Sequence, residues 1–430
     1  MSQILLKNRI SAIINKLIAT GFGHLFGSSV INRVLSLFSA IVLIRLIPKS
    51  EYGIYANANN ILGLFCISEG LGLSSAMLQY GCTWNGEKKR RLWSFCFYTS
   101  ALFNLILAIA IIFVGLTVNF SIPGTGKYLV AMALLPFVRF ISEMQRIYMR
   151  TEFRNKDFAK ANTFSTTVIV ALSILLSFMF LVYGIIAAHY LAGLLTIVFI
   201  CYYLKVRFPS PSFRLPKPEI KEIVKFSLTA ALCNSSAIIA MLMDTFLLGI
   251  IVAQSSVTAS YKVATMIPTA LAFIPTCVMT YIYPYFAKNA EDGQWCMRTL
   301  KKVFLGFGAF NILLCAILII GRRFWIAILF GDQYLDSAPA LCVLVLNYFI
   351  AATFAGVCGQ LLTTQKKLTF NLIVGIIVAL LNVLLNILLI PSFGAVGAAF
   401  ATVSATIFSA VTSSIYLVRL YKSKSSYHTT

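Results

Sequence analysis

Apolar runs fill most of this chain, and short polar gaps separate them. Between residues 21 and 420 twelve runs follow one another, most of them about as long as the roughly 20 residues that a helix needs to cross a bilayer. We expect helices, because a lipid-exposed backbone must satisfy its hydrogen bonds within its own segment. The predicted spans are 21–47, 53–81, 92–118, 127–147, 163–181, 183–204, 223–252, 258–285, 300–320, 337–363, 368–390 and 394–420.

Basic residues are concentrated in every second gap between these runs. The basic gaps are the N-terminal segment, Lys88–Arg91, 150–160, 205–225, 288–302, 366–367 and the C-terminal segment. The alternate gaps hold only Lys49, Lys127, Arg322 and Arg323. Cytoplasmic loops carry an excess of Lys and Arg. The alternation therefore predicts that both termini are cytoplasmic (N-in/C-in) and that the number of spans is even.

The longest polar gap divides the chain at its midpoint. It is rich in proline and predicted to be cytoplasmic, and it separates six spans from six others. Transporters are often built from two such halves. The predicted parts are an interfacial amphipathic helix (1–20), an N-terminal six-helix bundle (21–204), a proline-rich linker (205–222), a C-terminal six-helix bundle (223–420) and a cytoplasmic tail (421–430).

Composition agrees with a polytopic membrane protein and excludes a soluble one. Hydrophobic residues make up 59% of the chain and charged residues only 11%, against about 25% charged in soluble domains. The net charge of +22 follows from the basic gaps, so we expect no nucleic-acid partner. The ten cysteines contain no C-x-x-C pair, and we interpret them as packing residues without a metal or disulfide role.

Ionisable residues inside spans are the candidates for function, since each costs about 2.5–3.5 kcal/mol to insert. Arg33 lies on a polar face of span one, where it lines a cavity for an anionic ligand or pairs with Glu69 of span two. Arg139 and Glu143 share a face of span four. Arg139 there either holds a phosphate or pairs with Glu143, and the sequence leaves both alternatives open.

The second half of the chain contributes one cation and one acid. Lys262 lies on a stripe of threonines in span eight, which prolines interrupt at positions 268 and 275. Such a helix is typical of the wall of a hydrated cavity. Asp244 in span seven is expected to pair with Lys262 or with a cation. A face of span eleven holds Asn371, Asn382 and Asn386, and we interpret their side chains as forming hydrogen bonds between helices.

No pattern indicates catalysis. The sequence has no H-E-x-x-H, G-x-S-x-G or P-loop motif and only three histidines. We predict no catalytic residue, no cofactor and no metal site, and thus no enzyme. Arg45, near the outer end of span one, is expected from physics alone to extend to the interface.

Several strings resemble the polysaccharide and O-antigen flippases (Wzx-like) of the multidrug/oligosaccharidyl-lipid/polysaccharide exporter superfamily. The resemblance rests on R-L-I-P-K-S-E-Y-G-I-Y at 45–55, A-S-Y-K-V-A at 259–264, L-F-G-D-Q-Y at 329–334 and L-I-P-S-F-G-A-V-G-A-A at 389–399. Recurrent family positions are matched by Arg45, Gly53, Asp244, Tyr261 and Gly394.

The resemblance implies two six-helix bundles around a central cavity in a multi-pass protein of the bacterial cytoplasmic membrane. It implies alternating-access translocation of undecaprenyl-diphosphate-linked oligosaccharide units for O-antigen or capsule synthesis. The expected partners are the lipid-linked oligosaccharide, the bilayer, and polysaccharide polymerase and chain-length proteins. The substrate-binding candidates are Arg33, Arg45, Arg139 and Lys262, and the coupling or charge-pairing candidates are Glu69, Glu143 and Asp244.

Two other functions compete with this one. A drug/cation antiporter of the same superfamily would favour unpaired acids over arginines in its cavity. A polysaccharide polymerase would need a sizeable external loop, and the external gaps here are short. The pattern of charges therefore favours the flippase.

Overall fold

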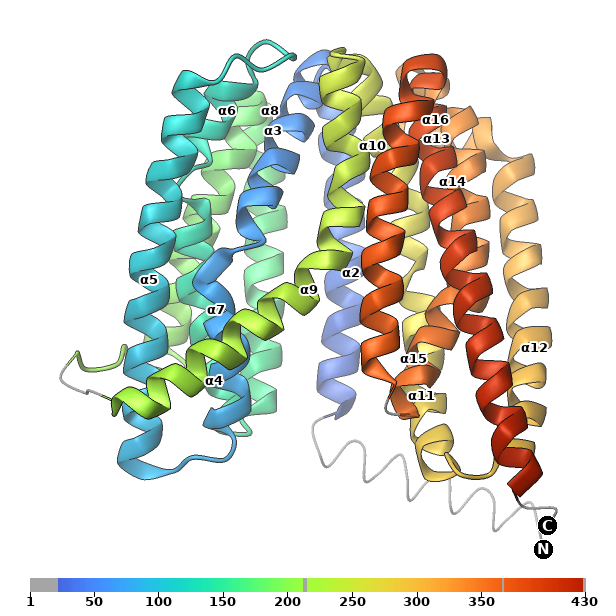
Figure 1. Ribbon diagram of the computed structural model, residues 1–430. Helices are drawn as coiled ribbons and strands as arrows, with labels where there is room; N and C mark the ends of the chain where they lie inside the picture. The colour runs from blue at the N-terminus through green and yellow to red at the C-terminus, as the bar shows by residue number, and fades with distance from the viewer. Residues whose placement is uncertain (1–21, 212–214, 366, 428–430) are drawn as a thin grey trace, which may run out of the picture. The chain divides into compact units, whose positions relative to one another are not determined.

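The computed structural model describes residues 22–211, 215–365 and 367–427 (Figure 1), and the predicted interfacial helix at 1–20 lies outside them. Across these residues the regular structure is helical, without strands, so the all-α fold is confirmed. The elements are α2 (Phe22–Leu46), α3 (Lys49–Cys66), the 3₁₀ helix η1 (Glu69–Gly72), α4 (Leu73–Gly81), α5 (Gly86–Thr117), α6 (Thr125–Ala131), α7 (Leu135–Thr151), α8 (Asn155–Tyr202), α9 (Lys217–Ile251), α10 (Ser255–Leu271), α11 (Phe273–Lys288), α12 (Gly293–Ile320), α13 (Arg322–Phe330), η2 (Asp332–Ser337), α14 (Ala338–Ile350), the π-helical η3 (Ala351–Ala355), α15 (Gly356–Thr364) and α16 (Leu368–Tyr427).

The apolar runs of the sequence coincide with these helices. Eight stretches of described residues are long and apolar enough to cross a membrane. Two of them, within α8 and α16, are 48 and 57 residues long. Each therefore holds two of the predicted spans. The orientation of the termini stays a prediction from the basic gaps.

The breaks inside α8 and α16 have the same construction. Leu181 in α8 has φ 50° and ψ −124°, and Gly394 in α16 has φ 52° and ψ −129°. Three residues after each break a glycine lies against the backbone of the first half. A Cβ on Gly184 would lie 2.3 Å from the Leu176 carbonyl oxygen, and a Cβ on Gly397 would lie 2.4 Å from that of Leu389. This matched geometry is a repeat that the residues alone barely show.

Contacts divide the described chain into two compact units. Unit 1 contains the described residues up to Ile47 with Phe65–Val118 and Gly126–Leu232. Unit 2 contains Pro48–Leu64, Asn119–Thr125 and the described residues from Cys233 onward. The segment Pro48–Leu64, which the sequence places in the N-terminal bundle, is thus packed with the second unit.

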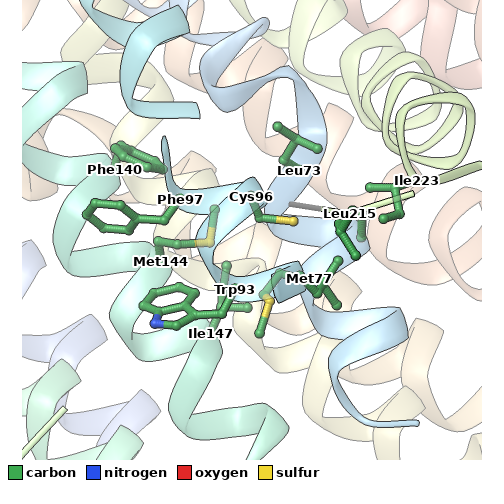
Figure 2. Close-up of a cluster of buried hydrophobic side chains, with 12 residues drawn as sticks. Leu73, Met77, Trp93, Cys96, Phe97, Phe140, Met144, Ile147, Leu215 and Ile223 are labelled. Atoms are coloured by element: carbon green, nitrogen blue, oxygen red, sulfur yellow. The ribbon is translucent and has the colours of Figure 1, made fainter. Parts of the chain in front are cut away.

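The core of unit 1 is a cluster of apolar side chains from α4, α5, α7 and the start of α9 (Figure 2). Trp93 and Phe97 of α5 belong to it, and the Phe97 ring contacts the Phe140 ring of α7 in a tilted geometry, with 5.5 Å between the centroids. Ile223 of α9 completes the cluster. This apolar packing fixes α4, α5 and α7 as the frame of the unit.

Helix α9 begins at Lys217, six residues before the start predicted for span seven. Pro218 lies in its first turn, where the missing N–H costs no hydrogen bond. The additional helical turns at 217–222 are bound to the rest of unit 1. The Tyr80 hydroxyl donates to Glu222 at 3.0 Å, and Lys88 forms an ion pair with Glu219 at 3.0 Å. The predicted linker therefore ends in helix.

The second predicted span is interrupted at its middle. Helix α3 ends at Cys66, and α4 starts at Leu73 after the short η1 turn (Figure 1). Gly70, Leu71 and Gly72 all have positive φ, between 53° and 70°, a conformation that suits glycine and strains leucine. A broken helix at membrane depth is typical of transporters, where it lies next to a binding or hinge site.

Candidate functional site

Asp244 of α9 is a buried carboxylate surrounded by hydrogen-bond donors. Its exposed fraction is 5%. Oδ1 accepts bonds from the side-chain amides of Asn382 at 3.0 Å and Asn386 at 2.7 Å. Oδ2 accepts bonds from the Tyr261 hydroxyl at 2.9 Å and from the Thr402 hydroxyl. Four donors thus stabilise a negative charge that burial would otherwise make costly.

The break in α16 is what brings these donors together. Asn382 and Asn386 lie one turn apart on its first half, and Thr402 lies on the second half. Because Gly394 turns the chain back and Gly397 allows close approach, both halves reach Asp244. Tyr261 comes from α10, so three helices converge on one carboxylate.

A pocket of about 270 Å³ opens next to this cluster within unit 2. Its wall contains Asp244, Asn382 and Lys262, together with the threonines of α10 at positions 265 and 269. The predicted threonine stripe of span eight therefore lines a cavity, as the sequence indicates. The buried amide oxygen of Asn347, also in the wall, has no hydrogen-bond partner, so the pocket offers acceptors as well as donors.

Lys262 and Asp244 share the pocket, and of the two expected partners of Asp244, Lys262 or a cation, Lys262 does not form a direct ion pair with it among the described residues. The described ion pairs within 4.0 Å do not join these two residues. The amides of span eleven explain why, because with Tyr261 and Thr402 they satisfy both carboxylate oxygens. Asn382 and Asn386 do make the interhelical bonds predicted for them, and their acceptor is the acid. Asn371 instead donates to the Gly359 carbonyl at 2.8 Å.

Unit 1 holds a second charged group, at the break in span two. Glu69 of η1 pairs with Arg139 of α7, with 3.8 Å between Oε2 and Nη2. The other carboxylate oxygen of Glu69 is buried without a partner. Of the partners that the sequence offers Arg139, the described ion pair is thus with Glu69. The Glu143 side chain is exposed, one turn further along α7.

The two remaining cations lie on α2, which packs against α8. Arg33 is at the middle of the helix and Arg45 in its last turn, and both side chains are exposed. Ser39 on the same helix is 7% exposed.

Sequence reasoning missed Thr402 as a member of the Asp244 cluster. Its hydroxyl also donates to the Ala398 carbonyl at 3.2 Å, which is the ordinary position of a threonine in an apolar helix. The sequence gives only a weak signal for this role of Thr402. Thr402 and Thr406 lie four residues apart, as Asn382 and Asn386 do, and the two pairs lie in the consecutive predicted spans 368–390 and 394–420. Among the described residues no group of three or more His, Cys, Asp or Glu could hold a metal ion.

Solved structures with the same fold are flippases and transporters. The chain superposes on the lipid II flippase MurJ in an inward closed conformation with a TM-score of 0.73 and 15% identity, covering 93% of this chain and 89% of that one. A multidrug resistance MATE family transporter of the MOP superfamily matches in its inward-facing conformation with TM-score 0.69, 16% identity, and 91% and 96% coverage. A structure of a MATE family transporter in the outward-facing conformation matches with a TM-score of 0.58 and 15% identity, covering 95% of this chain and 96% of that one.

Sequence comparison supplies the family. The search of curated proteins found no match. A family model described as polysaccharide biosynthesis protein matches residues 42–339, which is most of the chain. The matched segment runs from the end of α2 to the start of α14 and includes Asp244, Tyr261, Lys262, Glu69 and Arg139. This chain is therefore a multi-pass membrane protein of the polysaccharide biosynthesis family, with the fold of MOP-superfamily transporters and flippases.

Proposed function

We propose that this protein moves an undecaprenyl-diphosphate-linked oligosaccharide from the inner to the outer leaflet of the bacterial cytoplasmic membrane, for O-antigen or capsule synthesis. The family and the fold shared with a protein named a lipid II flippase support this choice. The glycan would cross through hydrated space while the lipid tail stays in the bilayer. Two negative charges moving outward would gain about 4.6 kcal/mol per 100 mV of inside-negative potential, at about 2.3 per charge.

The observation that carries the proposal is the state of Arg139. Its side chain is 56% exposed, and the distance of 3.8 Å between Arg139 Nη2 and Glu69 Oε2 is too long for a hydrogen bond. An arginine placed only to neutralise Glu69 would form a shorter, two-point pair. Arg139 therefore keeps its donors available for diphosphate oxygens, whose geometry its planar fork matches.

Lys262 and Asp244 provide complementary roles in unit 2. Lys262 lines the pocket with its ammonium group uncommitted to the acid, and we assign it to the anionic part of the substrate. Asp244 is the candidate for a coupling proton or sodium ion. Support comes from the oxygen-bearing side chains that converge on it and from the Asn386 amide oxygen, which is buried without a partner.

The test is a comparison of arginines on α7. Arg139→Gln should abolish glycan export and cause lipid-linked oligosaccharide to accumulate on the cytoplasmic side, whereas Arg139→Lys should retain part of the activity. Arg150→Gln is the matched control, because Arg150 is exposed at the end of the same helix. Export that survives Arg139→Gln at the control level would remove Arg139 from the mechanism. Resistance to cationic drugs, lost with Asp244→Asn, would instead favour the antiporter.

A further inference from the structure

A compact ion-pair cluster fastens the start of α3 to the rest of unit 2. The Lys49 ammonium donates to both carboxylate oxygens of Asp336, at 2.8 and 2.7 Å, and to the Gln333 carbonyl at 2.9 Å. Asp336 Oδ2 also accepts a bond from the Ser260 hydroxyl at 2.9 Å. The Lys49 side chain is only 18% exposed. Three elements, α3, η2 and α10, are thus joined at one carboxylate.

The rest of α3 is held to unit 2 by close backbone contacts and buried amides. A Cβ on Gly53 would lie 1.9 Å from the Ser255 carbonyl oxygen, so α3 and the start of α10 are in backbone contact. Asn57 donates to Thr125 at 3.1 Å, and Asn60 donates to the Leu242 carbonyl at 3.0 Å. Polar contacts of this kind can be exchanged at modest cost, unlike a large apolar core.

The far end of the same predicted span belongs to unit 1. Helix α4 packs on α5 and α7, and the positive-φ residues Gly70, Leu71 and Gly72 separate it from α3. The first half of the span, up to Leu64, therefore belongs to unit 2, whereas the turn and the second half belong to unit 1. Such a turn can absorb a change of angle between the two halves.

Two neighbouring residues of α10 connect the Lys49 cluster with the buried acid. Ser260 donates to Asp336, and Tyr261, the next residue, donates to Asp244. Both side chains are buried, at 3% and 1% exposure. A helix transmits displacement along its length, because its backbone bonds hold adjacent residues in fixed geometry. A shift of Tyr261 therefore moves Ser260.

We propose that Lys49, Asp336 and Ser260 form a latch that holds the first half of span two on unit 2, and that Tyr261 couples this latch to Asp244. This inference rests on the proposed alternating-access function. An ion bound at Asp244 competes with the Tyr261 hydroxyl proton for Oδ2. The hydroxyl then turns away, α10 shifts, and the Ser260 bond to Asp336 weakens. Occupation of Asp244 thus favours release of α3.

The latch is tested with a buried reporter on α3. Asn57 is 4% exposed, so Asn57→Cys reports release of α3 through its reaction with a water-soluble maleimide. The experiment uses the full chain in lipid nanodiscs, with the ten native cysteines replaced. We expect Lys49→Gln and Asp336→Asn each to accelerate labelling about tenfold, equivalent to about 1.4 kcal/mol. Ser256→Ala is the matched control, since Ser256 is exposed on the same helix.

A charge exchange separates loss of the latch from general damage. Lys49→Asp combined with Asp336→Lys should return labelling close to the parent rate, while each single change accelerates it. Unchanged labelling in Lys49→Gln and Asp336→Asn would overturn the latch. Acceleration that the exchange does not reverse would also overturn it, because the effect would then not depend on the ion pair.

The coupling is tested by a double-mutant cycle on the same reporter. Asp244→Asn imitates the neutralised, ion-occupied acid and should accelerate labelling severalfold. In a Tyr261→Phe background, Asp244→Asn should not change the labelling rate further, because the hydrogen bond from Tyr261 to Asp244 is already missing. Fully additive effects would overturn the coupling. No substrate is present in this assay, so its outcome is independent of the flipping activity, which fails or succeeds in transport experiments alone.

Discussion

Replacing Asp244 by asparagine or by alanine should give two very different proteins. Asparagine keeps the shape of the side chain and one oxygen acceptor, and it removes the charge. The amides of Asn382 and Asn386 can still donate to its Oδ1. The hydroxyls of Tyr261 and Thr402 lose the Oδ2 acceptor and must turn their protons away from the NH₂ group that replaces it. Alanine removes this acceptor from all four donors and leaves the buried Tyr261 hydroxyl without one, whereas Thr402 keeps the Ala398 carbonyl and Asn386 keeps the Asn382 carbonyl.

The magnitudes follow from these bonds. A hydrogen bond to a charged group contributes about 1.5–3 kcal/mol and a neutral one about 0.5–1.5. Asparagine also avoids the cost of burying a charge, which offsets part of the loss. We expect Asp244→Asn to lower the free energy of unfolding by about 1–3 kcal/mol. A buried donor left without an acceptor costs about 1–3 kcal/mol, so Asp244→Ala should cost about 1–3 kcal/mol more than Asp244→Asn, a large share of the total stability of many domains.

The assay combines thermal stability with transport. Fluorescence-detected size exclusion after heating should show Asp244→Asn folded and modestly less stable, and Asp244→Ala largely aggregated or absent from the membrane. Asp244→Asn should nevertheless lose glycan export. Asp332→Asn, at an exposed acid of the same unit, serves as control. An alanine variant as stable as wild type would refute the hydrogen-bond analysis, and full export by the asparagine variant would refute a role for the charge.

Further substitutions test individual contacts. Arg33→Ala should abolish export while the protein stays in the membrane, because its charge lies within span one; normal export would exclude it from the mechanism. Gly53→Ala should destabilise the attachment of α3, since a Cβ would lie 1.9 Å from the Ser255 carbonyl oxygen, and thermal stability measures the loss. Gly397→Val should likewise separate the two halves of α16, whose contact at Leu389 leaves no room for a side chain; normal export with unchanged stability would contradict the role given to that contact.

Much of the fold could be predicted from the sequence, because membrane helices are recognisable as long apolar runs. The apolar runs coincide with helices, and even the weak break before Gly184 is present, since backbone hydrogen bonding in lipid leaves few alternatives. The assignment of Pro48–Leu64 to unit 2 could not be predicted. This assignment depends on contacts between residues far apart in sequence, such as Lys49 with Asp336. The hydropathy of a segment contains no information about such contacts.

The candidate site was predictable in its ionisable members and not in its partners. Asp244 and Lys262 are conspicuous in apolar helices, so a cost argument finds them. The direct pair with Lys262, one of the two alternatives expected for Asp244, is not formed because uncharged donors occupy both carboxylate oxygens. Amides and hydroxyls are common in membrane helices as simple interhelical bonds, and only the turn at Gly394 places Asn386 and Thr402 on the same carboxylate.

Flipping by the purified protein is the most direct test of the central claim. The protein would be reconstituted into vesicles that contain lipid-linked oligosaccharide with the cell's own repeat unit in both leaflets. A membrane-impermeant, glycan-modifying reagent reaches the outer-leaflet pool directly, and it reaches the inner-leaflet pool only after flipping. The account predicts that wild-type vesicles expose the inner-leaflet pool and that Arg139→Gln vesicles expose only the outer-leaflet half. Equal exposure in protein-free, wild-type and variant vesicles would contradict it.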